Sequence, residues 1–211
     1  MVVNIVWNKE TVNVKILDFC LWLSSPMYAR IESRKLEQLY NESVKYGQTL
    51  ASKYPLKNEN IQSELIDYGV SEIQTFQTLR LKNVSEKAYY DIDTKQILWD
   101  DQFALTLFQK DDQAEELLGS VQKVEQALLI HEFFHFIEEN FEMPTDEFVF
   151  PNCHTNIASI FREIAAFAFT NVELDNYICQ FIDVLSLKIN KPTQYNELCR
   201  QYLIREKETH I

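Results

Sequence analysis

The sequence contains few of the residues that break helices or form phosphate-binding loops. Only three of its 211 residues are glycine and five are proline. It contains no G-x-G-x-x-G segment and no Walker-type loop, which excludes a nucleotide site built on a glycine-rich loop. The scarcity of glycine also argues against β-sandwiches and barrels and favours a helix-rich fold.

Long apolar runs and an excess of basic charge are missing as well. No stretch approaches the ~18 uninterrupted apolar residues of a membrane-spanning helix. Residues 1–9 lack the basic and apolar regions of a secretory signal peptide, so we expect a cytoplasmic protein with no membrane partner. The formal net charge of −12 argues against nucleic-acid binding and is compatible with a basic protein partner.

The cysteine pattern does not indicate a disulfide framework. The four cysteines lie far apart without C-x-x-C spacing, at Cys20, Cys153, Cys179 and Cys199, which favours reduced core thiols. Hydrophobic residues make up 46% of the chain and aromatic residues 13%, which is ample for a packed core. We expect one domain over residues 1–211, with a helical N-terminal part at about 1–70 and a catalytic core at about 71–211.

Hydrophobic periodicity divides the chain into many helices and a few short strands. Helical structure is predicted at residues 18–23, 31–54, 61–68, 101–118, 120–141, 155–170, 172–189 and 194–205, with Ser120 as an N-cap. Extended structure is predicted at residues 2–7, 12–17, 71–82, 87–92 and 96–99, the last two as a hairpin. The predicted fold class is therefore α+β and mostly helical, with a small sheet or hairpin before the helix at 120–141.

That helix contains His131-Glu132-Phe133-Phe134-His135, an H-E-x-x-H motif. Residues four apart lie on the same helix face, roughly 6 Å from each other. His131 and His135 can therefore both reach one ion at the ~2.0–2.1 Å of a zinc–nitrogen bond. Glu132 is rotated by about 100° from His131 and can act as a general base on a metal-bound water. The spacing predicts a zinc site.

A chance occurrence of the motif on a half-buried helix is the alternative. The flanking sequence disfavours it, because the residues around the motif are largely apolar, among them Val124, Ala127, Leu128, Phe136 and Ile137. Burying two histidines and a glutamate there without partners would cost on the order of several kcal/mol. A metal ion would provide a partner for both histidines.

Catalytic zinc normally has a third protein ligand. The metzincin pattern is excluded, because Glu138 and Phe141 stand where it requires glycine and histidine. Carboxylates on the motif helix or in the following loop are other candidates, but we expect Glu138, Glu139 and Asn140 to point towards solvent.

Glu163 is the strongest candidate for the third ligand. It is the only acidic residue of the apolar segment 160–169, in which Ala165 and Ala166 allow close packing against the motif helix. A buried carboxylate there requires a cation, either a metal ion or Arg162. Adjacent residues of a helix point apart, which disfavours Arg162 as its partner.

At these residues the chain resembles small bacterial zinc peptidases of the ImmA/IrrE anti-repressor type. Their pattern is a β-edge, an H-E-x-x-H helix and a later helix reading roughly E-x-x-A-N-x-F-A. Glu163, Ala166 and Phe169 match the second helix, whereas Phe167 stands in place of asparagine. The resemblance covers about residues 87–170. It implies a zincin-like fold with Glu163 as the third ligand, and a regulatory protease that cleaves a DNA-binding repressor.

The sequence supports peptide hydrolysis at a zinc ion held by His131, His135 and Glu163, with Glu132 as the general base. An extended protein or peptide substrate would pair with the hairpin at 87–99, although a purely structural hairpin is equally compatible.

Hydrolysis also requires a group that stabilises the oxyanion. His154 is the first candidate for this group, unless it is an ordinary surface histidine. Further candidates are Tyr177, Tyr195 and Tyr202. Neighbouring Cys153 is either an inhibitory thiolate ligand or, by default, a buried or loop thiol. Two other classes stay open: a metal-binding but catalytically silent interaction domain, and a metal-free helical interaction domain.

Overall fold

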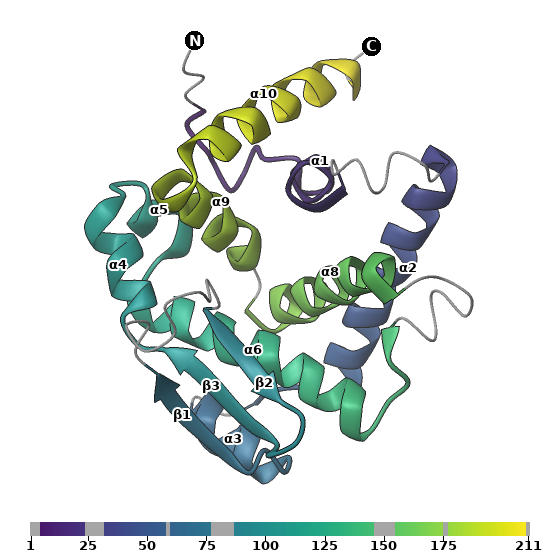
Figure 1. Cartoon of the computed structure of the whole chain (residues 1–211), viewed down its shortest axis with the longest axis vertical. Helices are drawn as coiled ribbons and strands as arrows, with labels where there is room; N and C mark the ends of the chain where they lie inside the picture. Colours follow the sequence, from purple (N-terminus) through teal and green to yellow (C-terminus); the bar gives the residue numbers. More distant parts are fainter. Residues whose placement is uncertain are drawn as a thin grey trace.

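The computed structural model describes residues 5–23, 32–57, 60–76, 87–145, 155–174 and 177–209. In these ranges the chain is mostly helical with one small sheet (Figure 1), which confirms the α+β, mostly helical class. The helices are α1 (Val14–Asp18), α2 (Ser33–Lys53), α3 (Ile61–Asp67), α4 (Phe103–Lys110), α5 (Ala114–Leu118), α6 (Val121–Asn140), α8 (Thr155–Leu174), α9 (Ile178–Asn190) and α10 (Pro192–Thr209), with a π-helical turn, η1 (Phe19–Leu23), after α1. None of these helices combines the length and apolar character needed to cross a membrane.

The sheet contains three strands in the order β1-β3-β2, namely β1 (Glu72–Phe76), β3 (Gln96–Asp100) and β2 (Ala88–Asp91). β2 and β3 are antiparallel, as the predicted hairpin requires, and β1 runs parallel to β3. The hairpin turn is closed by the Asp91 carboxylate, which accepts a hydrogen bond of 3.0 Å from the Asp93 backbone N–H. Among the described strands β2 pairs only with β3, and helix α6 (Val121–Asn140) also contacts β2.

Helix α6 is the central element. The sheet and α3 contact one side of it, α8 contacts another, and α2 covers α8 in turn (Figure 1). Apolar side chains from all of these elements form one core, in which Phe133, Phe134, Phe136 and Phe169 are fully enclosed. A second core joins α4, α5, α9 and α10 to the N-terminal segment. The motif helix is thus held from several sides, which fixes the residues that it presents.

The N-terminal segment was predicted wrongly in part. Residues 12–17 were expected to be extended, because apolar residues alternate there, but the chain forms α1 instead. The Asn13 side chain caps this helix by accepting a hydrogen bond of 3.1 Å from the Ile16 N–H, and Ile16, Leu17 and Cys20 are buried together in the second core. Tertiary packing and a cap therefore override the alternating pattern. The helical turn expected at residues 18–23 is confirmed as η1.

The helix expected at residues 101–118 is interrupted at Asp111. Its carboxylate accepts a hydrogen bond from the Gln113 N–H and forms a 2.6 Å ion pair with Lys188 of α9. A short side chain that bonds its neighbouring backbone competes with the helix, so the segment divides into α4 and α5. Residues 172–174 belong to the end of α8 rather than to α9, and residues 77–82 of the expected strand at 71–82 lie outside the described residues.

Candidate metal centre

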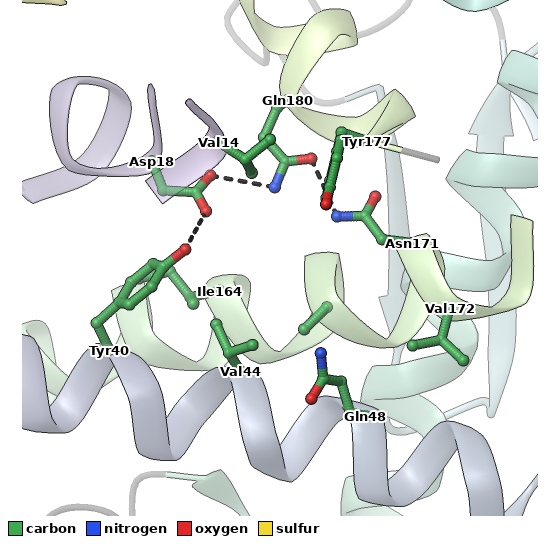
Figure 2. Close-up of a pocket in the computed structure, with 11 residues that line it drawn as sticks. Val14, Asp18, Tyr40, Val44, Gln48, Ile164, Asn171, Val172, Tyr177 and Gln180 are labelled. Atoms are coloured by element: carbon green, nitrogen blue, oxygen red, sulfur yellow. Dashed lines mark hydrogen bonds between the residues drawn. The ribbon is translucent and has the colours of Figure 1, made fainter. Parts of the chain in front are cut away.

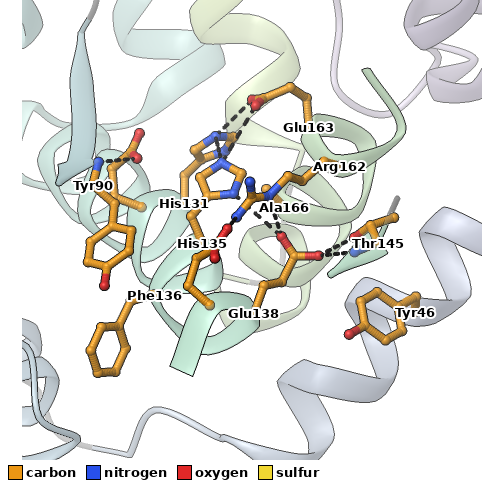
Figure 3. Close-up of polar contacts among 12 residues, drawn as sticks. Tyr46, Tyr90, His131, His135, Phe136, Glu138, Thr145, Arg162, Glu163 and Ala166 are labelled. Carbon is orange, nitrogen blue, oxygen red and sulfur yellow. Dashed lines mark hydrogen bonds and ion pairs between the residues drawn. The ribbon is translucent and has the colours of Figure 1, made fainter. Parts of the chain in front are cut away.

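The two motif histidines lie side by side on α6. Ser120 begins the helix as predicted, since its hydroxyl accepts a hydrogen bond of 3.2 Å from the Lys123 N–H. His131 and His135 are one turn apart, and their Nε2 atoms are separated by 3.3 Å (Figure 3). The buried phenylalanines of α6 anchor the opposite side of the helix in the core, so the histidines are fixed towards α8.

Helix α8 brings Glu163 to the same point. Glu163 Oε2 lies 3.1 Å from His131 Nε2, and Oε1 lies 3.6 Å from His135 Nε2. Among the described side chains, His131, His135 and Glu163 form the one group of three whose potential ligand atoms cluster closely enough to hold a metal ion. The Glu163 side chain is 36% exposed, so the cluster is open to solvent on one side.

The position of α8 depends on its contact with α2. Gly47 of α2 packs directly against the α8 backbone, and a Cβ there would overlap the carbonyl oxygen of Ala165. It would also lie 3.0 Å from the backbone nitrogen of Phe169. The glycine that interrupts the apolar pattern of α2 therefore allows the helix carrying Glu163 to lie close to α2.

Burial and opposite charges shift the pKa values of the cluster strongly. Burial alone would raise the pKa of Glu163, but the hydrogen bond and charge of His131 and the charge of His135 lower it to about 2. Burial alone would lower the pKa of His131, yet hydrogen bonds with Cys179 and Glu163 and the charges of Glu163 and Glu132 raise it well above its usual value. The opposite shifts describe a His131 imidazolium paired with the Glu163 carboxylate, and a metal ion held by both groups would take the place of the imidazolium proton.

Glu132 lines the same cavities as His131 and Glu163, and its carboxylate reaches β2. Its side chain is nearly enclosed, and Oε2 accepts a hydrogen bond of 2.9 Å from the Tyr90 backbone N–H. Burial raises the pKa of its carboxyl group, opposed by the charges of His131 and His135. A buried carboxyl group with a raised pKa has the properties of a general base and acid.

Glu138 was expected to point towards solvent, and this prediction was wrong. It is fully buried, because Arg162 of α8 reaches it with a 2.6 Å ion pair and the Thr145 backbone N–H donates to it over 2.8 Å. Burial raises the pKa of Glu138, but His135, Arg162 and Thr145 together lower it below its usual value. Its spacing of three from His135, on the same helix face, was the available sequence signal.

Arg162 pairs with Glu138 and Glu139 across the two helices, and no ion pair joins it to Glu163 (Figure 3). Adjacent residues of a helix point apart, so Arg162 was not expected to pair with Glu163. The carboxylate of Glu163 is therefore left to the two histidines.

Two cavities flank the cluster, and His131, Glu132 and Glu163 line both. The first, of about 300 Å³, has mainly apolar walls and an ion pair between Lys87 and Asp183 at its edge; its apolar lining comes from Trp22, Ala88, Ala127, Leu128, Phe167 and Ile182. The second, of about 520 Å³, lies along β2 and is lined by Tyr90, Arg162 and His135. Phe167, which stands where the ImmA/IrrE pattern has asparagine, packs its ring against His131 at a centroid separation of 5.4 Å.

The remaining candidates have different outcomes. His154 and Cys153 lie outside the described residues. Tyr195 and Tyr202 face the N-terminal segment rather than the cluster, because their hydroxyls accept hydrogen bonds from Trp7 Nε1 and the Asn13 N–H. Cys179, by contrast, contacts His131, although the sequence had indicated only a core thiol at this position.

Tyr177 lines a third cavity, of about 430 Å³, on another face of α8 (Figure 2). Buried Asp18 lies at its wall and accepts hydrogen bonds from Tyr40 (2.7 Å) and Gln180 (3.1 Å). This network joins α1, α2 and α9. The three tyrosines considered for stabilising the oxyanion thus lie apart from the histidine cluster.

Comparisons with protein-family models, with curated proteins and with solved structures found no match to this chain. The resemblance to the ImmA/IrrE type therefore stays a prediction that rests on the motif residues alone.

Proposed function

We propose that this protein is a zinc-dependent peptidase in which His131, His135 and Glu163 hold the ion. The observation that carries the proposal is the convergence of these three side chains from two helices. Tetrahedral bonds of ~2.0–2.1 Å hold ligand atoms about 3.3–3.4 Å apart. The two histidine Nε2 atoms lie 3.3 Å apart, and the two Glu163 oxygens lie 3.1 Å (Oε2) from His131 Nε2 and 3.6 Å (Oε1) from His135 Nε2, which is close to this spacing. Two imidazoles and one carboxylate are also a common catalytic zinc ligand set.

Bound zinc would supply a Lewis acid that polarises the substrate carbonyl and lowers the pKa of a water ligand. The chain itself provides the proton transfers. Glu132 accepts a proton as water attacks the carbonyl carbon, and delivers it to the leaving nitrogen as the C–N bond breaks. The products are an amine and a carboxylic acid, and the acid then gives up its remaining proton to the amine or to solvent. The Tyr90 N–H, by binding Oε2 of Glu132, orients the carboxylate for both transfers.

The surroundings of the cluster support a polypeptide substrate. β2, which pairs only with β3 among the described strands, borders the cavity of about 520 Å³, where an extended peptide can add as a strand. The apolar cavity of about 300 Å³ beside His131 suits an apolar side chain next to the scissile bond. The resemblance to the ImmA/IrrE type suggests a protein substrate such as a repressor.

Zinc content measured by elemental analysis tests the metal site directly. Wild type, Glu163→Ala and the control Glu125→Ala, which removes a carboxylate of α6 outside the cluster, would be purified in parallel without added metal. We expect about one zinc per chain in wild type and control and a sharp loss in Glu163→Ala. Absence of metal from the wild type, even after zinc addition and dialysis, would overturn the proposal.

Activity separates the two metal-binding alternatives. A library of fluorescence-quenched peptides would be incubated with zinc-loaded wild type and with protein treated with a chelator. Zinc-dependent cleavage supports the peptidase. Full zinc occupancy without cleavage of any library member, or of a candidate protein partner, would instead favour a catalytically silent interaction domain.

A further inference from the structure

Glu138 lies outside the H-E-x-x-H motif, yet it is a fully buried carboxylate. Its side chain is 0% exposed, although an ionised carboxylate is costly to bury and an apolar side chain could fill the same space. Arg162, moreover, already has a second partner in Glu139 at 2.6 Å. Holding α6 and α8 together therefore does not by itself require a buried carboxylate at position 138.

The two oxygens of Glu138 face different groups. Oε1 accepts hydrogen bonds from the backbone N–H and the hydroxyl of Thr145, where the chain leaves α6. Oε2 lies 2.6 Å from Arg162 Nε and 3.7 Å from His135 Nδ1 (Figure 3). The carboxylate thus reaches the loop, the helix of Glu163 and the second motif histidine at once.

The ring of His135 has one nitrogen turned to the cluster and one turned to Glu138. Nε2 faces His131 and Glu163, whereas Nδ1 is buried, has no hydrogen-bond partner among the described residues and lies 3.7 Å from Glu138 Oε2. A neutral imidazole carries its hydrogen on one nitrogen only. A carboxylate beside Nδ1 favours the hydrogen there, and this leaves the Nε2 lone pair free for an ion.

We propose that Glu138 is a positioning residue that holds His135 in the tautomer and orientation needed to bind the ion through Nε2. Through Arg162, the residue next to Glu163, the same carboxylate also fixes the approach of the third ligand. This inference rests on the proposed metal site, but the tautomer of His135 is a property of the metal-free chain and is measurable without any ion.

The first test is the tautomer of His135 in the metal-free wild type, measured from its ring ¹⁵N chemical shifts. We expect the hydrogen on Nδ1. A hydrogen mainly on Nε2 would overturn the inference even if the protein binds zinc and cleaves peptides. This measurement needs no variant, so a substitution that prevents folding does not remove the test.

The second test compares Glu138→Gln with Glu139→Gln in zinc affinity, measured by competition with a fluorescent chelator. Both variants remove one carboxylate from Arg162, but only the first removes the acceptor that faces His135. We expect Glu138→Gln to weaken zinc binding by about 10–100-fold and to mix the His135 tautomers. Glu139→Gln should keep an affinity within about threefold of wild type.

The comparison also separates this inference from the proposed function. Equal affinities for the two folded variants, with an unchanged tautomer, would reduce Glu138 to a structural contact and overturn the inference. Absence of zinc binding in the wild type would overturn the proposed function, and the positioning of an ion would fall with it, whatever tautomer the metal-free histidine adopts.

Discussion

At the scale of single residues, Glu132 is the most specific point of the proposed mechanism. The residue is 8% exposed, and its carboxylate is oriented by a hydrogen bond from the Tyr90 N–H. The motif predicted its role from the sequence, whereas the backbone donor that orients it came from β2. Hydrogen bonds between a side chain and a distant backbone group have no sequence signature, which is why this part of the site was not predictable.

Glu132→Gln should therefore remove catalysis without removing the ion. Glutamine keeps an oxygen to accept the Tyr90 hydrogen bond but cannot take up a proton. We expect peptide cleavage to fall by about 10²–10⁴-fold, with the zinc content unchanged. Cleavage kinetics and elemental analysis on the same preparations check this, with Glu125→Gln as the control. Substantial activity in Glu132→Gln would contradict the assignment of the base.

Asp18 gives a prediction for pH that is independent of the metal. It is 4% exposed, and burial raises the pKa of its carboxyl group to about 7, against the hydrogen bonds of Tyr40 and Gln180 and assisted by the charge of Asp183. The folded state thus holds this proton more tightly than the unfolded state. Its contribution to stability is fully present below the unfolded pKa of 3.8 and is lost as the pH rises through about 7.

When the pH is raised from 5 to 8, ionisation of Asp18 should lower the free energy of unfolding by roughly 2–3 kcal/mol. Asp18→Asn removes the titration and leaves an amide that can still join the network (Figure 2). Urea unfolding gives the free energy of unfolding of both proteins at pH 5 and pH 8. The effect is the change between the two pH values in wild type minus the same change in the variant. Equal pH dependence in wild type and variant would show that Asp18 ionises in the folded protein as it does in water.

At the scale of elements, periodicity predicted most of the helices, because most bury one apolar face, whereas the central helix α6 is buried on several sides. α2, α6 and the β2–β3 hairpin lie close to where the pattern located them. The failures have local causes. Asn13 caps α1 where alternating valines suggested a strand, and Asp111 breaks a continuous helical pattern with its own hydrogen bonds.

Gly47 tests the contact between α2 and α8. In an exposed helix, glycine to alanine stabilises by about 0.5–1 kcal/mol, but here the added Cβ overlaps the backbone of Ala165. Since the backbone of α8 cannot yield as a flexible side chain can, Gly47→Ala should destabilise the protein by about 1–3 kcal/mol. Chemical denaturation measures this, with Thr49→Ala at an exposed site of the same helix as the control. A stabilised Gly47→Ala protein would mean that the two helices are not in close contact.

At the scale of the whole molecule, the site exists because α6 and α8 pack side by side. His131 and Glu163 are 32 residues apart in sequence, yet their side chains meet at 3.1 Å. The meeting of Glu163 with the two histidines was predictable, because a lone carboxylate in an apolar helix requires a partner. The ion pairs of Arg162 with Glu138 and Glu139 were not, since they depend on the relative rotation of two helices, which no local pattern specifies.

An ion shared by α6 and α8 should also stabilise the fold as a whole, because the unfolded chain holds these ligands apart. Free zinc at about 100 times its dissociation constant adds about 2.7 kcal/mol. For a chain of this size that raises the melting temperature by about 5–10 °C. Thermal unfolding of wild type and Glu163→Ala, each with zinc and then with excess chelator, measures the increase and its reversal. Only wild type should respond fully. A rise of equal size in Glu163→Ala would locate the stabilising ion elsewhere, for example at the cysteines, and would separate the stability of the protein from the proposed catalytic centre.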